Sequence, residues 1–340
     1  MLPTTMSPAI SAIIVAPFGL THVRQLLRVL ARQTIRDRLE VVIMIPSRAD
    51  VDAAGEEALA AFAAHQVIET GPMSSLPRWR AEGVHAASAP VVVLTEDHCF
   101  PDPGWAEALV RAHEGPWAAV GPVFEPPDSP HPLARASCLM QYAPWTHPAR
   151  AGEVDDLPGH NSSYKRDLLL AYGERLATML AAESVLHWDL RRRGHRLWLE
   201  NGARVRHVYM TKLRGSLTES LYIARGFAAS RARGWSLPHR AAFVLASPLV
   251  PAVRLARLIP RAVALGWGRD LPRILPALLP QLAVSAAGEL IGCAFGIGNA
   301  VAMGVDLDTR RYRFVSAEAS AAIWGPRPDD PPGAAPAPRS

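Results

Sequence analysis

The chain has 340 residues, of which 49% are hydrophobic and 20% are charged, and its formal net charge is +5. This length and apolar fraction are sufficient for a buried core, and they exclude fibrous, collagen-like and wholly disordered proteins. The cysteines Cys99, Cys138 and Cys293 have the spacing of neither a disulfide framework nor a zinc site, so we expect a reducing compartment.

The positive charge is concentrated in one segment. Residues 191–240 contain 12 lysines and arginines but only two acidic residues, Glu200 and Glu219. No nucleic-acid recognition module accompanies this segment, so nucleic acid is not expected as a partner. A basic block beside an apolar region instead favours anionic ligands or a membrane surface.

The first part of the chain alternates predicted strands and helices. No basic segment precedes the apolar run Ile10–Val15, so this run is predicted to be a buried strand and not part of a signal peptide. Thr21 is the predicted N-cap of the helix that follows. Further strands are predicted at 39–45, 66–69 and 90–95, and further helices at 52–65 and 78–89.

Strands that alternate with amphipathic helices predict an α/β fold with a mostly parallel sheet that is covered on both faces. In such sheets, ligands bind beyond the carboxyl ends of the strands. This rule directs attention to Pro17, to Pro46-Ser47 and above all to Glu96-Asp97-His98.

The character of the sequence changes after residue 235. Residues 241–253 are uncharged, and residues 274–305 contain a single charge, Glu289. The segment Leu282–Val305 is a candidate membrane span, and Arg254, Arg257 and Arg261 recur at the spacing of an interfacial helix. An ordinary helical subdomain with a buried core is the alternative. We therefore expect one domain over 1–235, a hydrophobic and membrane-associated helical region over 236–305, and a tail over 306–340 that is Pro-rich and disordered from about 325.

The strongest local signal is the strand that ends in Glu96-Asp97-His98. Glu96 and His98 are two residues apart at a strand end, so both side chains could reach one divalent cation. A carboxylate with an imidazole suits Mn²⁺ or a similar ion, and a harder ion such as Mg²⁺ is compatible. The alternative is a solvated turn without a ligand.

Several motifs in order resemble the family 2 glycosyltransferases, which have the GT-A fold. The resemblance covers about residues 8–235. The motifs that carry it are Ala16-Pro17-Phe18, Arg80-Ala-Glu-Gly83, Glu96-Asp97-His98, Gly159-His160-Asn161, Glu183-Ser184 and His207.

This resemblance implies a GT-A domain of the bacterial type that moves a sugar from a nucleotide-sugar donor to an acceptor. It implies a divalent metal, Mn²⁺ or Mg²⁺, held by Glu96, His98 and His207, which would stabilise the leaving diphosphate. Glu183 is then the general base, which gives transfer with inversion. The remaining donor-site residues are Pro17, Arg80, Glu96, Asp97 and Asn161.

The sequence also departs from the family pattern. The metal motif reads Glu96-x-His98 in place of Asp-x-Asp, and Ser184 stands where a second acid is usual. The Gln-x-x-Arg-Trp motif of processive synthases is missing, so a non-processive enzyme is expected. A nucleotidyltransferase and a degenerate GT-A domain that docks on a membrane remain as alternatives. The expected acceptor is a glycan, a lipid-linked molecule or a small molecule, and the expected location is the cytoplasmic face of the inner membrane.

Overall fold

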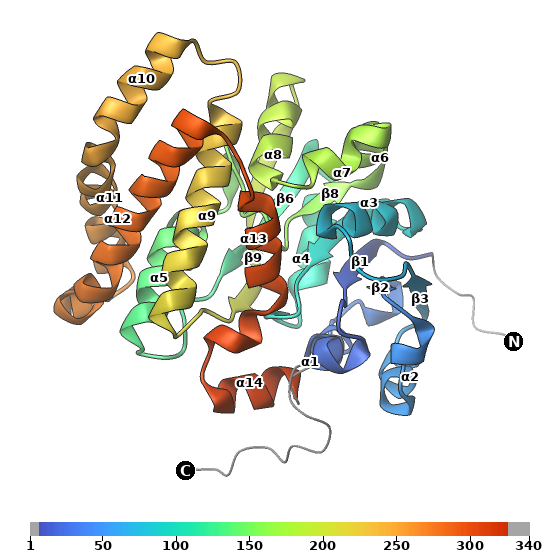
Figure 1. The fold of residues 1–340 in the computed structure, drawn as a ribbon. Helices are drawn as coiled ribbons and strands as arrows, with labels where there is room; N and C mark the ends of the chain where they lie inside the picture. Colours follow the sequence, from blue (N-terminus) through green and yellow to red (C-terminus); the bar gives the residue numbers. More distant parts are fainter. Residues whose placement is uncertain (1–6, 326–340) are drawn as a thin grey trace, which may run out of the picture. The chain divides into compact units, whose positions relative to one another are not determined.

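The computed structural model describes residues 7–325 (Figure 1). The chain forms two compact units. Among the described residues, the sheet unit comprises 7–125, 149–207 and 317–325. The helical unit comprises Pro126–Pro148 and Val208–Ser316.

A single mixed sheet organises the sheet unit, in the strand order β3-β2-β1-β4-β8-β6-β9-β5, with β7 beside β9. The strands are β1 (Ile10–Val15), β2 (Leu39–Ile45), β3 (Ala64–Glu69), β4 (Val91–Thr95), β5 (Cys99–Pro101), β6 (Trp117–Phe124), β7 (Gly152–Val154), β8 (Ser163–Lys165) and β9 (Arg196–His207). The strands predicted at 10–15, 39–45 and 90–95 are confirmed, each as a β-branched run whose side chains are almost all buried.

The first four strands are parallel and have their carboxyl ends at one edge. Ile10 of β1 pairs with Leu39 of β2 on one side and with Val91 of β4 on the other. Right-handed crossovers therefore place α1 (Leu20–Leu30) and α2 (Ala53–Leu59) on one face, and α3 (Leu76–Ala86) on the other (Figure 1). The predicted N-cap Thr21 is wrong: α1 begins at Leu20 after Gly19, whose φ of 78° suits a residue without a side chain.

The second half of the sheet differs from the mostly parallel arrangement that was expected. The short strand β8 is antiparallel to both β4 and β6, and β5 and β7 are antiparallel to β9. Strand β9 contains a bulge, because Pro122 pairs with Glu200 and the next residue, Val123, pairs with Arg204. The bulge lets one twelve-residue strand contact three partners, and the strand ends at His207, at the same edge as the carboxyl ends of the parallel strands.

The remaining helices of the sheet unit flank this sheet. They are α4 (Trp105–Ala112), α6 (Arg166–Leu170), α7 (Leu176–Met179), α8 (Glu183–Arg192) and α14 (Ala317–Trp324). Helix α8 begins at Glu183 and is followed by Gly194, which has a φ of 85°. Helix α14 packs on α1, so the last described residues belong to the sheet unit.

The helical unit consists of α5 (Pro132–Tyr142), α9 (Leu213–Arg231), α10 (Leu237–Ala246), α11 (Val250–Ala264), α12 (Leu271–Phe295) and α13 (Ala300–Thr309). Helices α9 and α12 lie side by side (Figure 1). They approach closely because α12 presents Gly288 and Gly292 to α9. A Cβ atom at these positions would lie 2.3 Å from the carbonyl oxygen of Leu221 and 2.4 Å from that of Arg225.

This close packing explains why the chain divides differently from the expected boundary at residue 235. Residues 208–231 form a helix that packs on α12, so they join the apolar C-terminal helices. The expected tail over 306–340 is helical as far as Trp324, and its Pro-rich part from residue 326 lies outside the described residues.

Two helical stretches, Leu237–Ala264 and Gly268–Phe295, are long and apolar enough to cross a membrane by length and composition. Core helices of soluble proteins meet the same criterion. The most apolar window is 6% buried in the first stretch and 44% buried in the second. The segment 282–305 is not the continuous span that was expected, because α12 ends at Phe295 before a turn that contains Gly296 and Gly298.

The arginines of α11 do not form the exposed basic face that an interfacial helix would have. Arg254 pairs with the buried carboxylate of Glu289, and Arg261 donates to the carbonyl oxygens of Ala143 and Thr146. Arg257 is exposed. The exposed surface of α10 and α11 is mainly apolar instead, because the buried Glu289 carboxylate and two backbone carbonyl oxygens hold the two other guanidinium groups.

Candidate metal centre and active site

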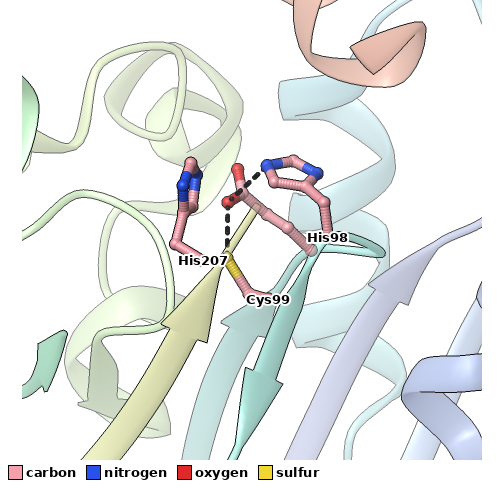
Figure 2. Close-up of side chains that lie close together, drawn as sticks. His98, Cys99 and His207 are labelled. Carbon is pink, nitrogen blue, oxygen red and sulfur yellow. Dashed lines mark hydrogen bonds and ion pairs between the residues drawn. The ribbon is translucent and has the colours of Figure 1, made fainter. Parts of the chain in front are cut away.

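Four potential metal ligands meet where β4, β5 and β9 come together. They are Glu96, His98, Cys99 and His207, all are buried, and their ligand atoms lie within 4.8 Å of one another. Figure 2 shows that the side chains of His98, Cys99 and His207 lie close together. Sequence analysis predicted three members of this group, and the structure brings those three together.

Local backbone geometry explains the convergence. The chain turns directly after β4, where the amide of Cys99 donates to the carbonyl oxygen of Glu96 at 3.1 Å. Strand β5 then runs antiparallel to β9, and Cys99 is the register partner of His207. A tight turn and one pair of strands thus collect residues that are more than 100 positions apart in the sequence.

The side chains are in close contact. Oε2 of Glu96 lies 3.3 Å from Nε2 of His98, and it accepts a hydrogen bond from the Cys99 thiol at 3.4 Å. The rings of His98 and His207 meet edge to face, with centroids 5.1 Å apart. One carboxylate, two imidazoles and one sulfur atom therefore surround a small volume that could hold one cation.

A buried charge network joins this cluster to Glu183. Arg80 on α3 lies 2.8 Å from Oε1 of Glu183 and 3.6 Å from Oε1 of Glu96. Nδ1 of His160 lies 2.7 Å from the same oxygen of Glu96 and 3.6 Å from Oε1 of Glu183. Arg80 and His160 thus each contact the carboxylates of both Glu96 and Glu183. Sequence analysis assigned different roles to these two carboxylates.

The network also sets the protonation of its members. Burial alone would raise the pKa of Glu96, but the charges and hydrogen bonds of His160 and His98 lower it well below its ordinary value. Burial opposes the charged form of His160, yet the carboxylates of Glu96 and Glu183 raise its pKa to about 9. Glu96 is therefore an ionised carboxylate, as a metal ligand must be.

Asp97 does not point at the cluster but supports it. Its Oδ1 lies 2.8 Å from Nδ1 of His98, and its Oδ2 accepts a hydrogen bond from the indole of Trp324 at 2.7 Å. A carboxylate on Nδ1 holds the proton there and directs Nε2 of the imidazole toward the cluster. Asp97 was predicted to lie in the donor site, and in this structure its two carboxylate oxygens contact His98 and Trp324.

Helix α8, which carries Glu183, is fixed by a second buried chain of hydrogen bonds. The Tyr164 hydroxyl lies 2.9 Å from Nε2 of His187, and Nδ1 of His187 lies 2.8 Å from Asp156. Burial and the Glu183 carboxylate raise the pKa of Tyr164 well above its ordinary value, so it stays neutral. At Gly159 a Cβ atom would lie 3.0 Å from Oε2 of Glu183, so the glycine leaves room for this carboxylate.

Asn161 and Pro17 lie at the same edge of the sheet. Asn161 has a φ of 62° and is fully buried. Its backbone N–H donates a hydrogen bond to the backbone carbonyl oxygen of Leu94 at the end of β4. Within residues 7–325, neither polar atom of its side chain has a hydrogen-bond partner. Such a buried amide is costly unless a ligand satisfies it. Pro17 is half-buried in the turn after β1.

Sequence reasoning missed three members of this region. His160 appeared only as the middle residue of a motif, Cys99 was dismissed on spacing, and Trp324 had no signal at all. The adjacency of Cys99 to the Glu96-x-His98 motif is the one clue that could have indicated its position. The contacts of His160 and Trp324 depend on packing between segments that are distant in the sequence.

Comparisons with solved structures identify the fold. A mannosyltransferase from Pyrobaculum calidifontis, solved with GDP-Man and Mn2+, aligns with 84% of this chain and 88% of its own, at a TM-score of 0.53 and 18% identity. GalNAc-T7, solved with UDP, GalNAc and Mn2+, aligns with 59% of this chain at a TM-score of 0.45 and 13% identity, and the chain spans 43% of that protein. No family model and no curated protein sequence matches the chain. The predicted fold class is confirmed: this is an α/β chain with the GT-A fold and an apolar helical region.

Proposed function

We propose that this protein is a metal-dependent glycosyltransferase that moves a sugar from a nucleotide-sugar to an acceptor hydroxyl. The observation that carries the proposal is the buried group of Glu96, His98 and His207 at the carboxyl edge of a GT-A sheet. The likeness to a mannosyltransferase that was solved with GDP-Man and Mn2+ supports the same donor chemistry. A divalent ion, Mn²⁺ or Mg²⁺, would be held by these three residues.

The donor set fits a divalent transition-metal ion such as Mn²⁺, because it supplies a carboxylate and two imidazoles in one small volume. A bound ion would act as a Lewis acid that stabilises the charge of the leaving diphosphate. Arg80 would add a fixed positive charge near the same group, since it already lies between Glu96 and Glu183. Asn161, Asp97 and Pro17 would complete the donor site.

Glu183 is the proposed general base. Its carboxylate would accept the proton of the acceptor hydroxyl while that oxygen bonds to the anomeric carbon and the bond to the diphosphate breaks, so the configuration inverts. Glu183 lies on a buried helix end and is held by Arg80 at 2.8 Å, which supports a defined position. Ser184 is the neighbouring residue, so the reaction would use one carboxylate.

The finer classification is also a proposal. The ordered motifs that resemble family 2 of the bacterial type, and the missing Gln-x-x-Arg-Trp motif, support a non-processive transferase. The acceptor would be a glycan, a lipid-linked molecule or a small molecule.

Location at the cytoplasmic face of the inner membrane is proposed on the exposed apolar surface of α10, α11 and the 3₁₀ turn Ser247–Leu249 that joins them. Leu245 is 81% exposed and Leu249 is 65% exposed, which is unusual for leucine. Insertion of this surface among lipid chains would remove the apolar side chains from water.

In the decisive test, the purified protein is incubated with Mn²⁺ or Mg²⁺ and a panel of nucleotide-sugars. Donor binding and slow donor hydrolysis are then measured. We expect metal-dependent hydrolysis of at least one donor, and its loss in His98→Ala. Release of pyrophosphate from a nucleoside triphosphate would instead identify a nucleotidyltransferase. Metal and donor binding that are both absent would identify a degenerate domain.

A further inference from the structure

We propose that the metal cluster prefers a thiophilic cation, with Zn²⁺ bound more tightly than Mn²⁺ or Mg²⁺, because the Cys99 thiolate is a fourth ligand. This inference concerns the metal site on which the proposed function rests, and it adds a ligand and a selectivity to that site. It changes the expectation from sequence, which considered oxygen and imidazole ligands only.

Cys99 is placed as a ligand would be. Its side chain is fully buried, it is the register partner of His207, and its sulfur lies 3.4 Å from Oε2 of Glu96. Its sulfur lies within 4.8 Å of the ligand atoms of Glu96, His98 and His207 (Figure 2). The other cysteines differ, because the sulfur of Cys138 lies against Thr146 and that of Cys293 against the carbonyl of Ala228.

The chemistry of this donor set favours zinc. Mg²⁺ prefers oxygen ligands in a near-octahedral arrangement, whereas thiolate, imidazole and a single carboxylate suit Zn²⁺, whose coordination can expand to five when a diphosphate oxygen binds. Nitrogen and sulfur ligands also bind Zn²⁺ more tightly than Mn²⁺ in general. The ligand atoms stand further apart than in a loaded site, so loading would draw the four side chains together.

A thiolate at Cys99 would also favour the binding of a dication. Arg80 and His160 already face the carboxylates of Glu96 and Glu183, so the thiolate would add a negative charge that offsets part of the charge of a bound dication. On binding, the S–H bond of Cys99 breaks, its proton passes to solvent and a sulfur–metal bond forms. The Asp97 contact that orients His98 is already in place, so this ligand needs no change of tautomer.

The test uses the full chain after removal of metal by a chelator under reducing conditions. Zn²⁺ and Mn²⁺ affinities are measured by competition with a chromophoric chelator, and Co²⁺ is added as a spectroscopic substitute for zinc. The variants are Cys99→Ser and Cys99→Ala, and Cys138→Ser is the matched control because it removes a buried cysteine elsewhere.

We expect the wild-type protein and Cys138→Ser to bind Zn²⁺ more tightly than Mn²⁺ and to show a thiolate-to-cobalt charge-transfer band. Cys99→Ser should lack this band and lose Zn²⁺ affinity by more than about tenfold, because even an outer-shell partner is worth about 10- to 100-fold. Its Mn²⁺ affinity should change little. If both Cys99 variants fail to fold, the cobalt spectrum of the wild-type protein decides whether a thiolate binds the metal.

A wild-type cobalt complex without the band overturns the inference, and so does a Cys99→Ser protein that keeps its Zn²⁺ affinity. Either result leaves the proposed function intact if Mn²⁺ still supports donor hydrolysis. Conversely, a thiolate band in a protein that hydrolyses no nucleotide-sugar would reject the proposed function and keep the inference.

Discussion

The indole N–H of Trp324 donates a hydrogen bond of 2.7 Å to Oδ2 of Asp97, 227 positions earlier in the chain. Asp97 in turn holds Nδ1 of His98 at 2.8 Å. The last described helix is therefore tied, through one carboxylate, to a candidate metal ligand. Trp324 is 1% exposed, so this contact is shielded from water.

Removal of the Trp324 indole N–H should weaken metal binding. Trp324→Phe keeps an aromatic ring but removes the N–H, so Asp97 and His98 lose part of their orientation. We expect metal affinity to fall by about 10- to 100-fold in a calorimetric titration. Trp198→Phe is the matched control, because it also breaks an indole–carboxylate hydrogen bond, to Glu200 at 3.1 Å, away from the cluster. Equal affinities in the two variants would contradict this role of Trp324.

Arg80 should matter for stability as well as for ligand binding. Arg80→Gln would leave the buried carboxylates of Glu183 and Glu96 without their guanidinium partner, at a cost of about 3–5 kcal/mol in the free energy of unfolding. Arg78→Gln on the same helix breaks an exposed pair with Glu82 and should cost about 0.5 kcal/mol or less. Urea unfolding of both variants measures the difference, and similar losses would argue against a buried network.

His113 should make the protein sensitive to mild acid. Burial, followed by the charge of Lys165, lowers the pKa of this histidine from 6.5 to about 4 in the folded state. Below pH 6.5 the unfolded chain takes up a proton that the folded protein does not accept until about pH 4. The contribution of neutral His113 is therefore complete above pH 6.5 and falls by about 3 kcal/mol as the pH drops through this window.

Unfolding in urea at a series of pH values checks this expectation. In His113→Gln the acid-induced decrease in stability between pH 6.5 and 4 should be smaller than in the wild-type protein. His65→Gln is the control, because His65 is exposed on β3. An unchanged pH profile in His113→Gln would assign the acid sensitivity to other groups.

Glu183→Gln separates catalysis from binding. An amide cannot accept the acceptor proton, so the rate of sugar transfer should fall by about 10²- to 10⁴-fold. Metal affinity and donor affinity should persist, since the cluster itself is intact. Glu174→Gln, at an exposed position before α8, should keep full activity. A Glu183→Gln protein with normal turnover would remove Glu183 from the mechanism.

The apolar surface of α10 and α11 gives a prediction for membrane binding. Leu245→Asp combined with Leu249→Asp should abolish flotation with vesicles that contain anionic lipid, because both side chains are largely exposed in the described structure. Leu213→Asp, on the exposed surface of α9, is the control. Flotation that persists in the double variant would exclude this surface as the membrane contact.

The sequence alone determined much of the sheet. Short β-branched runs bounded by proline and glycine predicted β1, β2 and β4 closely, because fully buried strands must be apolar on both faces. The rule that ligands bind at the carboxyl ends of such strands then singled out Glu96 and His98. Both predictions depend on local patterns and on one general property of parallel sheets.

Only the tertiary structure decided the composition of the site. Cys99 joins the cluster because β5 pairs with β9 in a register that aligns it with His207, and His160 joins because the loop before β8 reaches Glu96. Trp324 reaches Asp97 because α14 packs on α1. These contacts join segments that are far apart in the chain, and local propensity carries no information on such pairings, so no reading of the residues one after another could have found them.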